Sequence, residues 1–197
     1  MNTRVIGLTG AIGSGKSTVL KLASEIPGVV TVSADALVHA ILADPEHPVV
    51  HAIGQRLGAE LVSPAGVDRR RLGARVFGDI AARQWLEQQI HPAVRTMMLE
   101  RIAQAMGVAR AIVVEVPLLF ETGMHTMFAE TWAVLAAADT RQSRVHERDG
   151  LSATDFAARN DLQVDDATRQ RLATHLIHNH GDRAELQQQV AALLAPK

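Results

Sequence analysis

Five short, nearly continuous apolar runs recur along the chain, and stretches with the apolar spacing of helices separate them. The runs are Arg4–Leu8, Val29–Val32, Ala111–Val116, Thr131–Ala136 and Leu176–His178. Continuous apolar strands are typical of parallel sheets whose two faces are both covered. Because helical segments alternate with the runs, the pattern predicts an α/β fold with a five-stranded parallel sheet flanked by helices.

Two stretches are longer than this alternation needs. Residues 36–107 carry no strong strand pattern and read as helices punctuated by Pro and Gly, with a helix break expected at His91-Pro92. Residues 140–166, after the fourth run, are rich in Arg, Asp and Gln. We therefore predict one domain over residues 1–197. Its core is 1–35, 108–139 and 167–197, its helical insertion is 36–107, and its helical lid is 140–166.

The segment after the first run fits G-x-x-x-x-G-K-[ST] and leads into a helical pattern, the context that a phosphate-binding loop requires. Its glycines let backbone amides form a concave anion nest, to which the helix N-terminus adds its positive end. Lys16 is placed for the outer phosphates, and the Ser17 hydroxyl is placed for Mg²⁺. The motif predicts a nucleoside triphosphate site, the P-loop, whose residues are Ala11, Ile12, Gly13, Ser14, Gly15, Lys16, Ser17 and Thr18.

Other phosphate-binding proteins fit less well. A dinucleotide fingerprint needs a third glycine where Thr18 stands, and a GTPase needs an Asn-Lys-x-Asp guanine motif that the sequence lacks. The chain is short for a motor ATPase, although Glu115 follows an apolar run as a metal-site carboxylate would. A small-molecule kinase, with an acceptor-binding insertion and an Arg-bearing lid, accounts for both long stretches.

Composition narrows the classes further. The chain has no Cys, no Tyr, 3% aromatic residues and a formal net charge of -1. These values exclude a disulfide framework and a thiol nucleophile and argue against a nucleic-acid surface. No apolar run is long enough to span a bilayer, so we expect a cytoplasmic protein without membrane partners. His175, His178 and His180 suggest a metal site, but strand alternation splits them between two faces, and a metal site is the less favoured interpretation.

Further motifs, in order along the chain, resemble those of the dephospho-coenzyme A kinase family. They are Val5–Thr18, Ser33-Ala34-Asp35, Gly66–Arg69, Leu86-Glu87 with His91-Pro92, Glu115–Glu121, Arg144 with Arg148, and Gln163 with Asn179. The resemblance covers essentially the whole chain. The chain departs from the family at Ser33, which stands where the family has the first Asp of Asp-x-Asp.

The resemblance implies a P-loop kinase that uses Mg²⁺ and ATP to phosphorylate the ribose 3′-hydroxyl of dephospho-CoA. It implies these two small-molecule substrates, no nucleic acid, and a monomer or weak homo-oligomer. From spacing alone, Asp35 is equally an N-cap for a helix over Ala36–Ala43. The resemblance favours a catalytic role, in which Asp35 orients the acceptor hydroxyl and accepts its proton.

The resemblance assigns further roles, and each has a structural alternative. Arg148 would be the catalytic lid cation and Arg144 a nucleotide ligand, although a solvated helix face also explains both. Asn179 would contact adenine, or it would simply tolerate a left-handed turn. The residues implied to bind the acceptor are Arg69, His91, Pro117, Leu118 and Leu119. Their alternatives are a solvated basic run, a helix corner and core packing.

Overall fold

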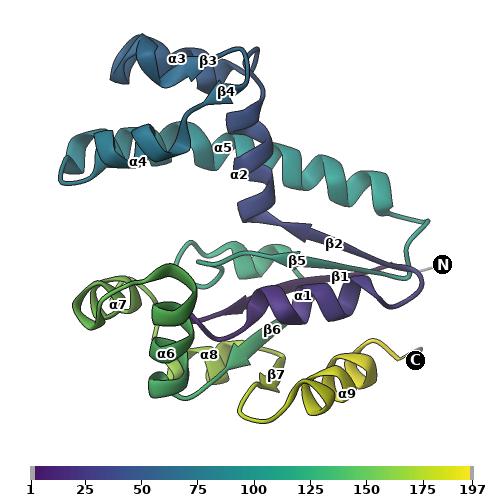
Figure 1. Cartoon of the computed structure of the whole chain (residues 1–197). Coiled ribbons are helices and arrows are strands. Elements are labelled where there is room, and N and C mark those ends of the chain that lie inside the picture. The colour runs from purple at the N-terminus through teal and green to yellow at the C-terminus, as the bar shows by residue number, and fades with distance from the viewer. Residues whose placement is uncertain (1–2, 196–197) are drawn as a thin grey trace. The chain divides into compact units, whose positions relative to one another are not determined.

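The computed structural model describes residues 3–195, and the chain divides into two compact units (Figure 1). Unit 1 comprises Met1–Ser33 and Ala105–Lys197, and unit 2 comprises Ala34–Gln104. The insertion predicted from the sequence, 36–107, falls close to the bounds of unit 2.

Unit 1 is built on a five-stranded sheet with the order β2-β5-β1-β6-β7, in which all neighbouring strands are parallel. The strands are β1 (Arg4–Gly10), β2 (Val29–Ser33), β5 (Ala111–Glu115), β6 (Glu130–Leu135) and β7 (His175–His178). The five predicted strands are thereby confirmed. Because β1 is central, the loop after it leaves the middle of the carboxyl edge, where ligands bind in open parallel sheets.

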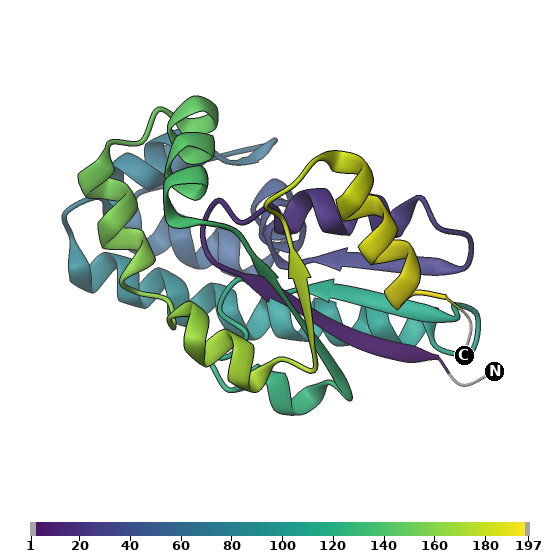
Figure 2. The ribbon, with the colours of Figure 1, turned by 90° about the horizontal axis from the view of Figure 1, so that it is seen from below.

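Helices cover this sheet. The helices α1 (Lys16–Ser24) and α9 (Arg183–Leu193) pack side by side on one side of it (Figure 2), and α8 (Asp166–Leu172) lies against β6. The remaining elements of unit 1 are η2 (Met124–Met127), α6 (Ala138–Asp149) and α7 (Ala153–Asn160). Ile6, Leu8 and Trp132 on the central strands are fully buried, so the core holds the strand ends that carry the site.

Unit 2 has its own apolar core. Its helical elements are α2 (Ala34–Ala43), α3 (Pro48–Leu57), η1 (Ala59–Leu61), α4 (Arg69–Val76) and α5 (Ile80–Ala105), whose last residue belongs to unit 1. A small hairpin, β3 (Val62–Ser63) and β4 (Gly66–Val67), was missed by the sequence pattern. Strands of two residues show no alternation, so only the turn between them was visible.

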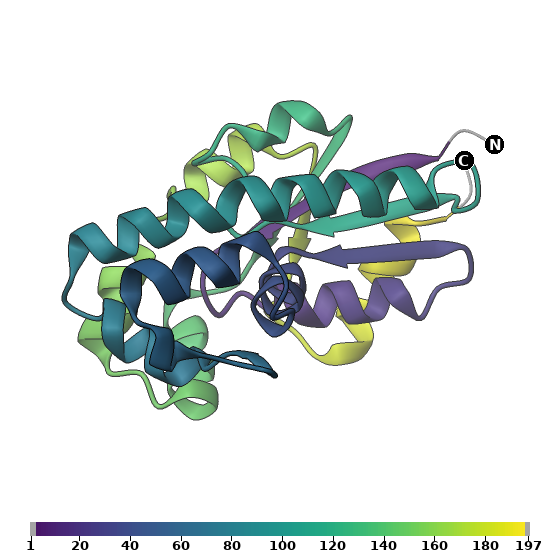
Figure 3. The same ribbon diagram turned by 90° about the horizontal axis from the view of Figure 1, so that it is seen from above.

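The helix break expected at His91-Pro92 is wrong. Helix α5 runs unbroken from Ile80 to Ala105 with Pro92 inside it (Figure 3). Proline removes one helical hydrogen bond and crowds the preceding turn. Residues on both sides of Pro92, such as Ile90 and Val94, pack against the core of unit 2 and hold the helix together. Among residues 3–195, no helix combines the length and apolarity needed to cross a membrane.

Candidate active site

The P-loop joins the end of β1 to the start of α1. Gly13 (φ 77) and Gly15 (φ 97) adopt the left-handed backbone conformation that favours glycine. Gly15 occupies the N-cap position of α1 and makes no side-chain cap there. A side chain at Gly15 would collide with the amide of Asn179. The loop therefore offers the uncapped helix start that binds anions.

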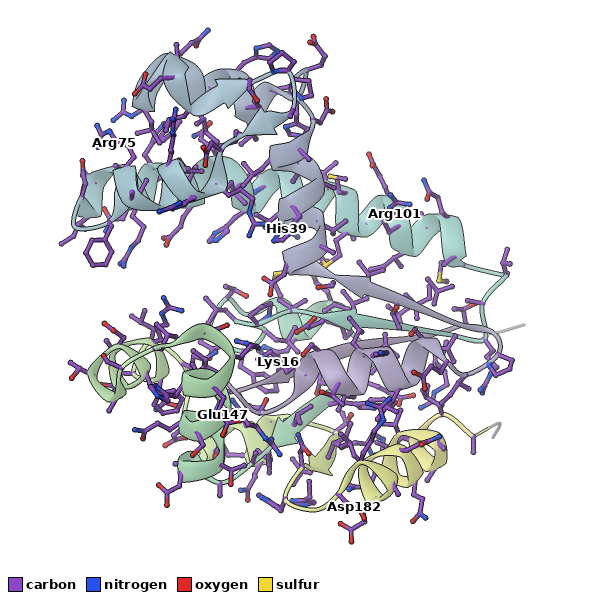
Figure 4. All side chains as sticks on the ribbon, viewed as in Figure 1. Lys16, His39, Arg75, Arg101, Glu147 and Asp182 are labelled. Atoms are coloured by element: carbon purple, nitrogen blue, oxygen red, sulfur yellow. The ribbon has the colours of Figure 1, made fainter. Side chains whose placement is uncertain are left out.

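Lys16 and Ser17 begin α1 and have different surroundings. The Lys16 Nζ donates hydrogen bonds to the carbonyl oxygens of Gly10 (2.8 Å) and Ala11 (3.2 Å), which hold the ammonium group against the loop. Lys16 lies at the amino end of α1 (Figure 4). Ser17 is exposed, so its hydroxyl is accessible to a ligand.

Two polar side chains beside the P-loop come from the segments that follow β6 and β7. The buried Asn179, just after β7, donates from Nδ2 to the Ser14 carbonyl oxygen at 2.7 Å. Arg144 of α6 donates from Nη2 to the Asn179 carbonyl oxygen at 3.4 Å. The Arg144 Nη1 is buried and has no hydrogen-bond partner within residues 3–195. Because buried donors are nearly always satisfied, a phosphate-bearing ligand suits this position.

A buried carboxylate lies where β2 and β5 end. Glu115 is 6% exposed and accepts a hydrogen bond from the Ser33 Oγ at 3.1 Å, and the two residues are register partners. The carboxylate of Glu115 and the hydroxyl of Ser17 are both oxygen ligands of the kind that Mg²⁺ prefers. No cluster of three metal-binding side chains occurs in the described part of the chain. A small number of protein ligands is enough for Mg²⁺, because waters and substrate phosphates complete its coordination shell.

Three of the other predicted residues, Asp35, Arg69 and His91, belong to unit 2. Asp35 is exposed in the first turn of α2, which begins at Ala34, so its interpretation as an N-cap is wrong. Arg69 is exposed at the start of α4, and its Nη1 lies 3.2 Å from the Nδ1 of His39. His91 is exposed within α5. The roles of Asp35, Arg69 and His91 stay predictions.

Comparison with known proteins identifies the family, because the model of the dephospho-CoA kinase family matches residues 4–185. The chain belongs to the dephospho-CoA kinase family. A dephospho-CoA kinase from Symbiobacterium thermophilum is 39% identical over 191 residues, which are 96% of this chain and 79% of that protein. The resemblance inferred from the motifs is thereby confirmed.

Solved structures agree. A crystal structure from Thermus thermophilus is 33% identical, with a TM-score of 0.78 and 100% of both chains covered. A dephospho-CoA kinase from Campylobacter jejuni is 25% identical, with a TM-score of 0.69 over 98% of this chain and 96% of that one. The predicted α/β kinase fold is confirmed by these likenesses.

The two arginines of the family's lid motif lie differently. Both are on α6, one turn apart, and Arg144 donates to the carbonyl oxygen of Asn179 beside the P-loop. Arg148 is exposed and donates to Asp149 from Nε (2.8 Å) and Nη2 (2.6 Å). These hydrogen bonds lower the pKa of Asp149 below its usual value. The catalytic role of Arg148 stays a prediction.

The loop after β5 contains the family's Pro-Leu-Leu sequence, and its two leucines differ. Leu118 and Pro117 are half-buried, whereas Leu119 is fully buried and packs over Gly7. Leu119 thus has no exposed surface for an acceptor, and we remove it from the predicted acceptor site.

The sequence pattern missed one residue beside the P-loop. Arg141 of α6 is 6% exposed and donates from Nη1 to the Ile12 carbonyl oxygen at 3.4 Å and from Nε to the Ala136 carbonyl oxygen at 3.1 Å. It lies outside the motifs that carry the resemblance. The burial of Arg141 is what distinguishes it from the other arginines of α6. The sequence does not predict that burial, because Arg is mostly exposed in proteins.

Proposed function

We propose that this chain transfers the γ-phosphoryl group of ATP to the ribose 3′-hydroxyl of dephospho-CoA. The observation that carries the proposal is a complete P-loop, with the buried Arg144 donor beside it, in a chain of the dephospho-CoA kinase family. The acceptor oxygen forms a bond to the γ-phosphorus as the bond from that phosphorus to the β–γ bridging oxygen breaks. The products are coenzyme A and ADP.

The P-loop and the side chains around it neutralise the charge of the triphosphate. Phosphoryl transfer needs positioning and cations at the transferring group more than covalent chemistry. Lys16 and Arg144 bind the triphosphate, Asn179 binds the adenine end, and Arg148 stabilises the transferring group. The Ser17 hydroxyl would hold Mg²⁺, with the Glu115 carboxylate as a further oxygen ligand, and the bound ion would supply positive charge to the phosphates.

Asp35 serves as the base. It lies in the first turn of α2, directly after β2 ends at Ser33. Ligands bind at the carboxyl ends of parallel strands. Its exposed carboxylate orients the 3′-hydroxyl and accepts its proton as the new bond forms. Arg69, His91, Pro117 and Leu118 bind the rest of the acceptor.

The setting of the reaction follows from its substrates. Both are small molecules, so the chain acts without nucleic-acid or membrane partners. It works in the cytoplasm, as a monomer or a weak homo-oligomer.

A coupled ADP-release assay with a panel of hydroxyl acceptors tests this function. We expect turnover with dephospho-CoA and little with nucleosides or nucleotides. The variant Asp35→Asn should lower kcat by about 10²–10⁴-fold while ATP affinity is retained. Lys16→Ala should lower both kcat and the affinity for ATP. Turnover with another acceptor and none with dephospho-CoA would contradict the proposal.

A further inference from the structure

Residues 160–164, which run from the last residue of α7 into its connection to α8 (Figure 2), are held by three side-chain hydrogen bonds to distant parts of unit 1. The Asn160 Oδ1 accepts from the Arg141 Nη1 at 2.7 Å. The Gln163 Oε1 accepts from the Ile12 amide at 2.8 Å. The Val164 amide donates to the Glu121 Oε1 at 2.8 Å. Three anchors over so few residues are more than a plain connection between helices requires.

One of these anchors holds the P-loop itself. Both backbone polar groups of Ile12 are bonded from outside the loop, the amide by Gln163 and the carbonyl oxygen by Arg141. An amide that donates to the protein does not donate to a phosphate. The Ile12 amide is therefore a point of attachment, and its attachment fixes the position of the loop beside the left-handed Gly13.

The surroundings make this attachment rigid. The Arg141 guanidinium is buried and lies 5.7 Å from the ring centroid of Phe156. It donates to three neutral acceptors, which belong to Ala136 just after β6, to Ile12 of the P-loop and to Asn160. Burial lowers the pKa of Arg141 below its usual value. A side chain at Gly13 would collide with the Arg141 carbonyl oxygen, so α6 and the loop approach closely.

We propose that Gln163 is a positioning residue for ATP: its carboxamide oxygen, bound to the Ile12 amide, keeps the P-loop in the form that binds the triphosphate. The inference rests on the proposed function only for the identity of the acceptor. Gln163 touches no substrate and acts through the loop. Loss of its bond leaves the Ile12 amide unsatisfied and frees the loop to move, which weakens the nucleotide site selectively.

The experiment measures ligand affinity by calorimetry, with a non-hydrolysable ATP analogue and with dephospho-CoA, alongside steady-state kinetics. Gln163→Met keeps the length of the side chain but removes the oxygen that accepts the hydrogen bond. Gln163→Asn keeps the carboxamide, but its side chain is too short to reach the Ile12 amide. Each should weaken the ATP analogue about tenfold, the size of one lost hydrogen bond to a buried group. The dissociation constant of dephospho-CoA should change less than about twofold, and kcat at saturating ATP should stay close to that of the unaltered protein.

Asp165→Ala is the matched control. The Asp165 Oδ1 accepts from the Thr168 amide at 2.7 Å at the start of α8, two positions from Gln163. Its loss should lower the melting temperature, as the loss of a helix cap does, without changing ATP affinity.

Two results would overturn the inference. One is unchanged ATP affinity in both Gln163 variants, with melting curves that show them folded. The other is equal weakening of both ligands, which indicates general loosening. Because calorimetry needs no turnover, these results are distinct from a failure of the proposed function, which would appear as absent turnover in the unaltered protein.

Discussion

Ser33 gives a buried carboxylate a neutral neighbour. Its hydroxyl donates to Glu115, the register partner across β2 and β5, at 3.1 Å. An aspartate at this position, as in the family's Asp-x-Asp, would set two carboxylates together in a site that water reaches poorly. Two like charges at such a distance coexist only when a cation or a proton lies near them. The serine thus makes the strand ends less dependent on a bound cation.

The variant Ser33→Asp should therefore be destabilised, and Mg²⁺ should restore it. The Coulomb repulsion is about 4 kcal/mol for charges ~4 Å apart at an effective dielectric constant of ~20. Side-chain movement relieves part of this, so we expect the free energy of unfolding to fall by about 1–3 kcal/mol in EDTA. Urea denaturation with and without MgCl₂ measures it.

Ser33→Ala is the control for this prediction, because it removes the hydroxyl without adding a charge. It should show no response to Mg²⁺ beyond that of the unaltered protein. An Asp variant that is equally stable with and without the cation would show that the two carboxylates do not meet at this edge.

Residues of the site differed in how far the sequence predicts them. Lys16 and Ser17 lie in a contiguous motif, whose spacing itself dictates the backbone, so their place in the P-loop was predictable. Arg144 and Arg148 share a helix face by periodicity. Periodicity does not say what each of them contacts, because that depends on where α6 packs. The structure brings Arg144 to Asn179, whereas Arg148 bonds to Asp149.

At the scale of elements, helix α5 shows how packing overrides a local signal. Pro92 is exposed inside the helix, and its ring leaves the carbonyl oxygen one turn earlier without its usual donor. Trp85, Leu86, Met97 and other residues of α5 pack against the core of unit 2 on both sides of the proline. The burial of this face outweighs the free-energy cost of the proline. Propensities of single residues do not include the effect of burial, so they predict a break.

Replacement of this proline should stabilise unit 2. Pro92→Ala restores one backbone hydrogen bond and removes the steric conflict, so we expect the free energy of unfolding to rise by about 1–3 kcal/mol. Thermal and urea denaturation measure the change. Pro48→Ala is the control, since Pro48 begins α3 where proline is favourable, and it should bring no gain. Destabilisation by Pro92→Ala would show that a bend at this point is needed.

The strands and the hairpin illustrate the same limit. The strands β1, β2, β5 and β6 were predictable because each consists mostly of apolar residues, and such runs have few other uses in a chain of this composition. The hairpin of Val62–Ser63 and Gly66–Val67 depends on its packing inside unit 2, where Val67 is buried. Nothing in four residues distinguishes it from a loop.

At the scale of the whole molecule, the residues predicted for the nucleotide lie in unit 1, whereas those predicted for the acceptor lie in both units, since Pro117 and Leu118 belong to unit 1. The P-loop, Glu115, Arg144 and Asn179 belong to unit 1, and Asp35, Arg69 and His91 belong to unit 2. Each unit has its own apolar core. Because only the acceptor is proposed to bind residues of unit 2, the proposed site predicts ligand effects that are separable along the sequence.

Hydrogen exchange measures this division directly. A ligand that binds the native state stabilises it by RT ln(1 + [L]/Kd), about 2.7 kcal/mol at one hundred times Kd, and local opening reports where that stabilisation falls. A non-hydrolysable ATP analogue should slow exchange in residues 10–24 and in α6, whereas dephospho-CoA should slow it in α2 and α4. Lys16→Ala should abolish the first effect and leave the second. Protection by dephospho-CoA confined to unit 1 would contradict the assignment of the acceptor to Asp35 and Arg69.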